Sequence, residues 1–374
     1  MTFFAGFEPG SALSNTRQGH LLWMVALLGL LFAPSACQTP EEARAEWLKE
    51  SRAVFELTET DPPAADRGLR VPHYPASNER RIDFFRPYVK DLGGTYIGVG
   101  TDQNLTFVAW ARSEFAWLMD FDEVAVYVNR IHFFFLTQSP KFEDFSKLWS
   151  RKEKQNSYAL LQKTFGSAAD WAAYKQAWLI AHRGESDVPE RFYELKYMSR
   201  HFGLKSFHND PADYQYIRTL AMEGRIQAIP GDLRGQITMA AIAKKSAELK
   251  LPVRLLYLSN AEDYFDFPED MRRNFKALPV DQKSVVIRTI SVGAQSLGFP
   301  PGEKFPEAGP LHYNVQSLPV FQQWMNYYPK KRLRVMHMLI NKGADFKTRG
   351  FSVQQKTPAD LGLVKTTEPA AGAQ

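Results

Sequence analysis

Residues 93–122, GGTYIGVGTDQNLTFVAWARSEFAWLMDFD, decide the fold of this chain. The segment from Thr95 to Val99 is β-branched or aromatic except at Gly98, which predicts a strand. Gly98 and Gly100 then permit a sharp turn where a side chain would clash. The helix predicted next, from Gln103 to Arg112, has apolar residues at helical spacing, so one face of it can lie on a sheet.

A second strand closes this unit. Phe115 to Met119 is an almost unbroken apolar run, as expected of a strand covered on both faces, and Asp120 and Asp122 follow it. Asp120 comes about 20 residues after the glycine turn, the usual spacing between such a turn and the acid that binds a ribose. The order of strand, glycine turn, helix, strand and acid indicates a nucleotide-binding βαβ half.

Strands and helices alternate again in the second half of the chain. The predicted strands are Ile226–Ile229, Val253–Leu258 and Ser284–Ile290, and the predicted helices are Gly235–Leu249 and Glu269–Ala277. This alternation favours parallel pairing with right-handed crossovers. We therefore predict an α/β fold with a Rossmann-like, mostly parallel sheet of at least five strands, built from residues 79–128 and 221–299.

Only helical patterns occur between the second and third predicted strands. The predicted helices are Phe142–Trp149, Tyr158–Phe165, Ala168–His182, Pro189–Phe202 and Pro211–Met222. We interpret residues 129–220 as a helical insertion that forms a lid beside the ligand crevice. For its aromatic run from His132 to Phe135, core packing is the favoured role over ligand stacking.

The amino terminus has the pattern of an export signal. An apolar run of about 12 residues from Leu21 to Phe32 is too short to span a membrane as a helix, and it is followed by small residues and Cys37, the one cysteine. This resembles the lipobox of bacterial lipoproteins, although Pro34 stands where leucine is usual. The resemblance implies that residues 1–37 are a signal peptide and that Cys37 is acylated. The alternative is a plain secretory peptide with an incidental cysteine.

Further segments flank the predicted core. Residues 38–78 are polar and rich in proline, which predicts a tether with one short helix, Glu41–Leu57. Residues 300–374 are predicted to form a helical extension with a disordered tail after Val364. The stretches from Arg332 to Asp345 and from Lys356 to Leu361 resemble the second helix of one ankyrin repeat and the opening of the next. Because a single repeat cannot bury its own face, we expect a helix docked on the core.

Four motifs in order carry a further resemblance. YIGVGTDQN begins at Tyr96, WLMDFD at Trp117, IQAIPGDL at Ile226 and LLYLSNAEDYF at Leu255. Together they resemble the motifs of class I S-adenosylmethionine-dependent methyltransferases, with Tyr96 standing in place of the family's usual acid.

The resemblance implies S-adenosylmethionine as the cofactor. In that family Gly98 and Gly100 would face its methionine end, Asp120 its ribose and Asp232 its adenine edge, with Ser259 and Asn260 at the reacting centre.

The start of the helix after the glycine turn adds Asp102, Gln103 and Asn104 to the candidate cofactor-binding residues, and Asp122 joins them beside Asp120. Asp102 stands where the methyltransferase motif has its third glycine. A carboxylate here caps the helix and repels phosphate, so dinucleotides are disfavoured. Whether Asp102 only caps the helix or also contacts a ligand stays open.

The candidate catalytic residues follow the strand Val253–Leu258. They are Ser259, Asn260, Glu262 and Asp263, in a cluster that ends with Tyr264. The cluster combines a hydroxyl, an amide, two carboxylates and a phenol where α/β enzymes place their chemistry. In methyl transfer one of the carboxylates could take a proton from the acceptor. The alternative is a turn in which Ser259 or Asn260 caps the next helix.

The composition of the chain limits which binding partners are expected. The net charge of +5 is mild and the basic residues are scattered, so we expect no nucleic-acid partner. Asp120 and Asp122 have no further ligand at suitable spacing, so we expect no metal. The predicted partners are a small-molecule ligand and, through the lipid anchor at Cys37, the membrane of the bacterial cell envelope, with outer-membrane attachment as the default.

Two functions remain open. The first is an exported methyltransferase-like enzyme that acts on a small or lipid-linked acceptor. The second is a non-catalytic envelope lipoprotein that uses the same fold to bind a ligand or protein. Weighing against the first, S-adenosylmethionine is made in the cytosol.

Overall fold

The computed structural model describes residues 39–62, 73–184, 186–291, 294–303, 310–328, 333–338 and 344–364. The predicted signal peptide with Cys37 and the predicted tail after Val364 lie outside these residues. The chain divides into two compact units at Trp47 and Leu48, within helix α1 (Pro40–Phe55). Across the described ranges, no helix combines the length and the apolar character needed to cross a membrane.

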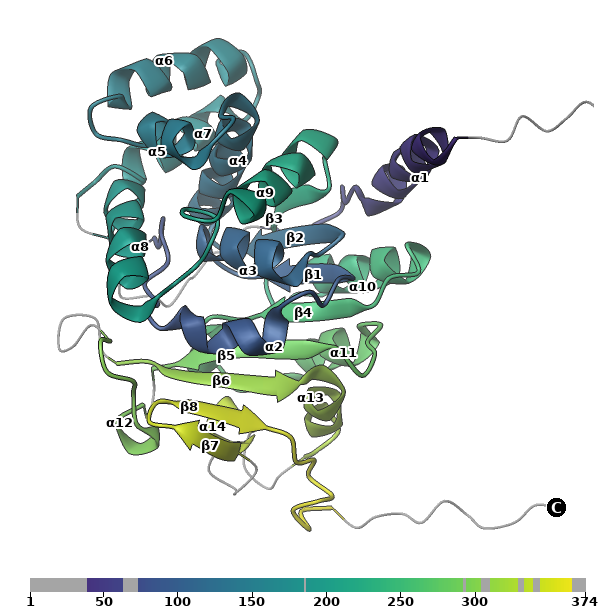
Figure 1. Cartoon of the computed structure of the whole chain (residues 1–374). Coiled ribbons are helices and arrows are strands. Elements are labelled where there is room, and N and C mark those ends of the chain that lie inside the picture. Colours follow the sequence, from purple (N-terminus) through teal and green to yellow (C-terminus); the bar gives the residue numbers. More distant parts are fainter. Residues whose placement is uncertain are drawn as a thin grey trace, which may run out of the picture. The chain divides into compact units, whose positions relative to one another are not determined.

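An eight-stranded mixed sheet forms the centre of the second unit, in the order β3-β2-β1-β4-β5-β6-β8-β7 (Figure 1). The strands are β1 (Thr95–Gly98), β2 (Phe115–Asp120), β3 (Ile226–Pro230), β4 (Val253–Tyr257), β5 (Val285–Ile290), β6 (His312–Ser317), β7 (Ala344–Thr348) and β8 (Phe351–Gln354). The first five are parallel to one another, and β6 is antiparallel to β5. The predicted α/β class, its five strands and its mostly parallel sheet are confirmed.

Helices cover both faces of the sheet because successive strand residues point to opposite sides. In β1, Tyr96 belongs to one apolar cluster and Ile97 to the other. The first cluster includes residues of η1 (Ile82–Phe85), α2 (Arg86–Val89), α3 (Gln103–Ala111), α4 (Glu123–Gln138) and α9 (Pro211–Glu223). The second includes residues of α10 (Thr238–Glu248), α11 (Glu269–Ala277), α13 (Leu318–Met325) and α14 (Val335–Met338).

The crossover from β2 to β3 is entirely helical in its regular structure, as predicted. Between α4 and α9 it contains α5 (Phe142–Leu148), α6 (Lys154–Phe165), α7 (Trp171–Ile180) and α8 (Val188–Phe202) (Figure 1). His132 and Phe135 of α4 are fully buried, and their rings lie 4.7 Å and 5.2 Å from the ring of Trp149. The predicted packing role of this aromatic run is confirmed.

The carboxyl-terminal part extends the sheet, which corrects the prediction of a helical extension. β6, β8 and β7 add three strands beyond β5. The strand β6 was not predicted because its sequence contains polar residues. Two of them, Asn314 and Gln316, are buried, and both accept hydrogen bonds from Arg288. Only Val335–Met338 is described as helical in the ankyrin-like stretch, and β7 begins at Ala344.

Residues 48–62 of the predicted tether pack on the core of the second unit. The ring of Phe55 lies 5.0 Å from Phe115 and 4.7 Å from Trp117. The carboxylate of Asp61 is buried and accepts a hydrogen bond from the backbone N–H of Ile237 at 2.9 Å. Residues 48–62 are therefore part of the fold rather than an extended spacer.

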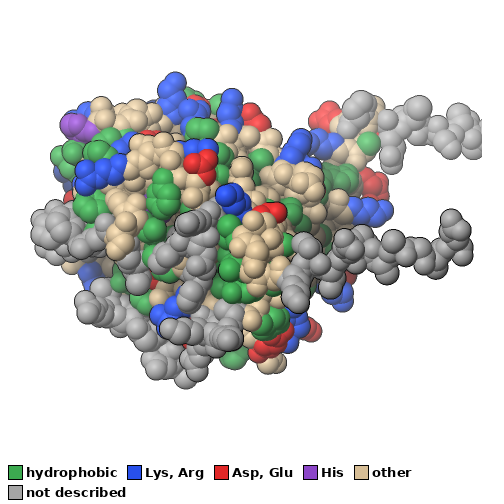
Figure 2. All heavy atoms as spheres, turned by 90° about the horizontal axis from the view of Figure 1, so that it is seen from below, with side chains coloured by type: hydrophobic (Ala, Val, Ile, Leu, Met, Phe, Trp, Pro, Cys, Tyr) green, Lys and Arg blue, Asp and Glu red, His purple; other side chains and the backbone are tan. Residues whose placement is uncertain are grey.

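Charged side chains of both signs are mixed on the face drawn in Figure 2. Among the described residues visible there, basic side chains alternate with acidic and apolar ones. This distribution matches the mild net charge of +5.

Candidate functional site

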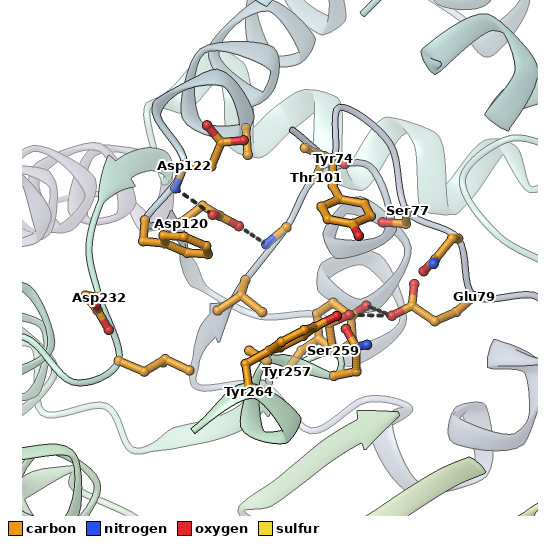
Figure 3. A pocket seen from close by; sticks show the side chains of 18 of the residues that line it. Tyr74, Ser77, Glu79, Thr101, Asp120, Asp122, Asp232, Tyr257, Ser259 and Tyr264 are labelled. Carbon is orange, nitrogen blue, oxygen red and sulfur yellow. Dashed lines mark hydrogen bonds between the residues drawn. The ribbon is translucent and has the colours of Figure 1, made fainter. Parts of the chain in front are cut away.

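A cavity of about 430 Å³ lies at the carboxyl ends of the five parallel strands (Figure 3). Its lining includes one residue at or just past the end of each, namely Gly100, Asp120, Asp232, Ser259 and Ser291. Strand order reverses between β1 and β4, and ligands of open α/β sheets bind at such a switch point. The volume is within the range of small-molecule sites.

The two glycines of the turn after β1 have different roles: Gly98 is needed for packing, and Gly100 lines the cavity. A Cβ at Gly98 would overlap Asn104 Oδ1 and the hydroxyl of Tyr96, which are hydrogen-bonded to each other at 2.6 Å. Gly98 and Asn104 are therefore structural residues and do not line the cavity. Gly100 does line it, and its φ of +84° favours glycine.

Asp102 does not face the cavity, which corrects its predicted role as a helix cap or ligand contact. Its side chain makes no cap hydrogen bond; it is fully buried and accepts from Arg191 Nε of α8 at 3.0 Å. It also accepts from the backbone N–H of Ser77 at 2.8 Å. Gln103 is buried beside it and accepts from Arg191 Nη2 at 2.5 Å. Asp102 and Gln103 thus join the turn to the helical crossover.

The two acids after β2 both line the cavity, as predicted for ligand-binding residues. Asp120 accepts the backbone N–H groups of Gly100 and Asp122, each at 2.9 Å. Asp122 caps α4 by accepting from the N–H of Val124 at 3.1 Å, and its carboxylate lies 3.0 Å from Nδ1 of His73. Within the described residues Asp120 thus accepts only backbone N–H groups and forms no ion pair, whereas Asp122 lies beside His73.

Burial raises the pKa of Asp120 to about 7, and the nearby charge of Asp122 adds to the shift. The N–H groups of Gly100 and Asp122 oppose it. Near neutral pH this carboxyl exists in both protonation states, so it can accept a hydrogen bond from a ligand hydroxyl or donate one.

Asp232, predicted at the adenine edge, lines the cavity beside Arg234. The carboxylate accepts from Arg234 Nη2 at 2.8 Å and from Nε at 3.0 Å. The guanidinium lies 4.9 Å from the ring centre of Phe265. This corner of the cavity offers a paired charge and a flat apolar surface.

The turn after β4 brings Ser259 and Asn260 to the cavity, as predicted. Ser259 has a φ of +48°, a strained conformation for a residue with a side chain and one that is frequent at functional sites. Its Oγ donates to Glu79 Oε1 at 2.6 Å, and the Tyr257 hydroxyl donates to the same oxygen at 2.6 Å (Figure 3).

Glu262 and Asp263 do not line the cavity, which corrects their prediction as catalytic residues. Glu262 is buried and forms an ion pair with Arg288 of β5. Asp263 accepts from the backbone N–H of Ser291 at 2.7 Å and from its hydroxyl at 2.9 Å. The two acids after β4 thus support their own loop, and Glu79, from the segment before β1, is the acid that contacts Ser259.

Residues 74–355 match the family described as "Domain of unknown function (DUF7790)". The chain belongs to the DUF7790 family. No curated protein matches the sequence. The match begins at Tyr74, so every residue that lines the cavity falls within the DUF7790 domain.

The DUF7790 cavity contains residues that sequence reasoning missed. Glu79 is 1% exposed and also accepts from Gln103 Nε2 at 2.9 Å. Tyr74 and Tyr264 line the cavity and are 41% and 55% exposed (Figure 3). Glu79 and Tyr74 lie in a segment without periodicity, so no sequence signal distinguished them. Tyr264, by contrast, belongs to the cluster after β4 that was predicted to be catalytic, and it does line the cavity.

The charge of the lining is predominantly acidic. Its carboxylates are Glu79, Asp120, Asp122 and Asp232, and Arg234 is the one Lys or Arg side chain among the described residues that line it. No group of three His, Cys, Asp or Glu side chains within the described ranges could hold a metal ion. The cavity is therefore suited to a neutral or cationic ligand with hydrogen-bond donors.

Proposed function

We propose that the DUF7790 domain binds S-adenosylmethionine in this cavity and transfers its methyl group to a small or lipid-linked acceptor. The observation that carries the proposal is the meeting of Gly100, Asp120, Asp232, Ser259 and Asn260 around one cavity. These residues come from all four motifs of the methyltransferase resemblance. Fold alone does not fix function, so the proposal depends on this site.

Each cofactor group has a matching residue in the proposal. Asp120 accepts the ribose hydroxyls, and Asp232 with the flat side chain of Phe265 lies at the adenine. The backbone of Gly100 approaches the methionine end closely because no side chain intervenes. Ser259 and Asn260 lie at the methyl group.

The acidic lining supports a phosphate-free cofactor. Four carboxylates line the cavity, and the guanidinium of Arg234 is already paired with Asp232. A dinucleotide would bring two phosphates into this field, whereas S-adenosylmethionine brings a positive sulfonium. The charge balance thus favours the sulfonium ligand.

Binding without turnover is the second candidate, and one observation favours it. Glu262 and Asp263, the expected bases, do not reach the cavity. A single-turnover assay with radioactive methyl donor and cell-envelope extract separates the two, since only the enzyme transfers label to an acceptor.

For the location we propose an exported lipoprotein anchored through Cys37 at the bacterial envelope. Palmitate labelling of cells that express the full chain tests this anchor. Label is expected on the wild type and absent from Cys37→Ser; label that persists in the variant contradicts the anchor.

Calorimetry with S-adenosylmethionine tests the proposed cofactor. Binding is expected for the wild type and is lost on Asp120→Ala, because the variant removes the acceptor for the ribose hydroxyls. Asp345→Ala is the matched control, since Asp345 is exposed on β7, away from the cavity. A flat titration of the wild type contradicts the proposal.

A further inference from the structure

We infer that the methyl acceptor is a primary amine, held by the side-chain oxygens of Ser259 and Asn260. The inference rests on the proposed function and identifies the substrate class of the same site. It also assigns positioning roles to Glu79 and Asp263. Their carboxylates determine where the side chains of Ser259 and Asn260 direct their hydrogen atoms, and so which lone pairs face the cavity.

Glu79 determines what Ser259 presents to the cavity. A hydroxyl has one hydrogen to donate and two lone pairs. The hydrogen of Ser259 is directed to Glu79 Oε1 at 2.6 Å, and no described residue donates a hydrogen bond to Ser259 Oγ. The lone pairs of this oxygen are therefore left for a ligand. Tyr257 donates to the same carboxylate and accepts from Gln103 Nε2 at 3.1 Å, so Tyr257 is largely satisfied.

Asp263 determines, through Ser291, which atom of the Asn260 side-chain amide faces the cavity. The carboxylate accepts the hydroxyl hydrogen of Ser291 at 2.9 Å, which leaves Ser291 Oγ as an acceptor. Asn260 Nδ2 donates to that oxygen at 3.3 Å. This bond fixes the orientation of the amide, and Oδ1 accepts no hydrogen bond within the described residues. Asn260 thus offers an oxygen to the cavity.

Ser259 and Asn260 are consecutive residues of one turn in the cavity lining, and each is oriented by an acid, in the case of Asn260 through Ser291. Two acceptor oxygens at this turn select a particular nucleophile. A primary amine has two N–H groups for two acceptor oxygens, and its nitrogen keeps a lone pair for the attack. An alcohol has a single O–H and leaves one acceptor facing lone pairs. A carboxylate is repelled by Glu79 and Asp120, which line the same cavity.

The reaction balances with these groups. An amine that arrives as an ammonium first passes a proton to Ser259 Oγ while the Ser259 hydrogen moves to Glu79. The nitrogen lone pair then forms the new C–N bond, and the C–S electron pair goes to sulfur. The products are S-adenosylhomocysteine and a protonated N-methylamine. Glu79 then gives up the proton that it took, back through Ser259 to solvent, which restores the site.

A pair of cofactor analogues tests the inference without knowledge of the acceptor. Sinefungin has a primary amine on carbon where the methylated sulfur stands in the cofactor, whereas S-adenosylhomocysteine has no group there. We expect the wild type to bind sinefungin at least about 10-fold more tightly in calorimetry, as hydrogen bonds to a charged amine provide. Ser259→Ala and Asn260→Ala should each reduce this ratio severalfold and leave the affinity for S-adenosylhomocysteine nearly unchanged.

Further variants separate positioning from structural support. Glu79→Gln can donate to Ser259 and Asp263→Asn can donate to Ser291, so each should lower the ratio of the two affinities. A merely structural role would lower both affinities together and leave the ratio unchanged, which contradicts the inference. Ser146→Ala in α5, outside the cavity, is the matched control for Ser259→Ala.

Equal binding of the two analogues to the wild type overturns the amine inference while the proposed function stands. If neither analogue binds, the proposed function itself fails and the inference with it. Should the buried Glu79 variant fail to fold, the ratio measured on Ser259→Ala and Asn260→Ala still decides the question.

Discussion

The crossover from β2 to β3 and the short segment from His73 to Glu79 contribute very differently to the cavity. The crossover spans residues 121–225, yet among its described residues only Phe121, Asp122 and Ala125, all near its start, line the cavity. The short segment supplies Tyr74, Ala76, Ser77, Asn78 and Glu79. The predicted lid therefore does not line the cavity, and residues predicted as part of a tether do.

The difference teaches how each kind of structure is used. Helices of the crossover bury their apolar faces against the sheet and against one another, which leaves few side chains for a ligand. The segment from His73 to Glu79 has no regular structure before it reaches η1, so consecutive side chains can turn into the cavity. Arg191 links the two regions, because its Nη1 donates to the backbone oxygen of Glu79 at 3.0 Å.

Removing that link should give the largest effect on stability. Arg191→Met leaves the fully buried carboxylate of Asp102 without its ion-pair partner, and we expect a loss of about 3–5 kcal/mol in the free energy of unfolding. Urea denaturation measures it. Adding Asp102→Asn should recover part of the loss because the buried charge is gone.

Lys244→Met is the control, because it also removes a positive charge from an ion pair, but from an exposed one with Glu248. It should change the free energy of unfolding by less than about 0.5 kcal/mol. If Arg191→Met unfolds at the same urea concentration as this control, the crossover does not support the cavity through Arg191. Ligand binding should also weaken in Arg191→Met, although Arg191 does not line the cavity.

Asp120 belongs to the sheet itself, at the end of β2, and its carboxyl touches the start of the crossover through the N–H of Asp122. Because its pKa is raised to about 7, the folded state holds a proton that the unfolded state releases near pH 4. This contribution to stability is complete below about pH 4 and is lost as the pH rises through about 7. It amounts to a few kcal/mol at most.

Asp120→Asn should therefore flatten the decrease in stability between pH 5 and pH 8 and make the protein more stable than the wild type at pH 8. Thermal unfolding across this range measures the difference between the two proteins. Parallel pH curves for wild type and variant would show that Asp120 is charged throughout, as in an ordinary exposed carboxylate.

The sequence alone predicted the parts of the fold that follow a repeated pattern of strands and helices. The five parallel strands were predictable because each is a short apolar run before a polar turn, and residues at strand ends meet at one edge of a parallel sheet. This reasoning placed Asp120, Asp232, Ser259 and Asn260 at the cavity. The strand β6 was missed because buried Asn314 has the polarity of an exposed residue, and its partner Arg288 is distant in sequence.

Side-chain direction within a turn was not predictable. Asp102 and Glu262 occupy positions where a carboxylate could face a ligand, but each is turned inward to an arginine from another element, Arg191 or Arg288. The reverse holds for Glu79, which faces the cavity residue Ser259 although its partners Tyr257 and Ser259 lie 178 and 180 residues later in the sequence. Such pairings depend on tertiary contacts that neither periodicity nor motif spacing encodes.

The smallest expected effect compares one tyrosine from each region. Tyr74 lines the cavity and is 41% exposed, whereas Tyr193 of α8 is 64% exposed and does not line it. A sulfonium beside an aromatic face gains about 0.5–1 kcal/mol, so Tyr74→Ala should weaken S-adenosylmethionine binding about two- to fivefold in calorimetry. Tyr193→Ala should leave the affinity unchanged, and both variants should keep the unfolding midpoint of the wild type because neither side chain belongs to the apolar core. An equal loss of affinity in the two variants would mean that the segment from His73 to Glu79 makes no specific contact with the ligand. The two regions would then differ in where they lie and not in how they bind.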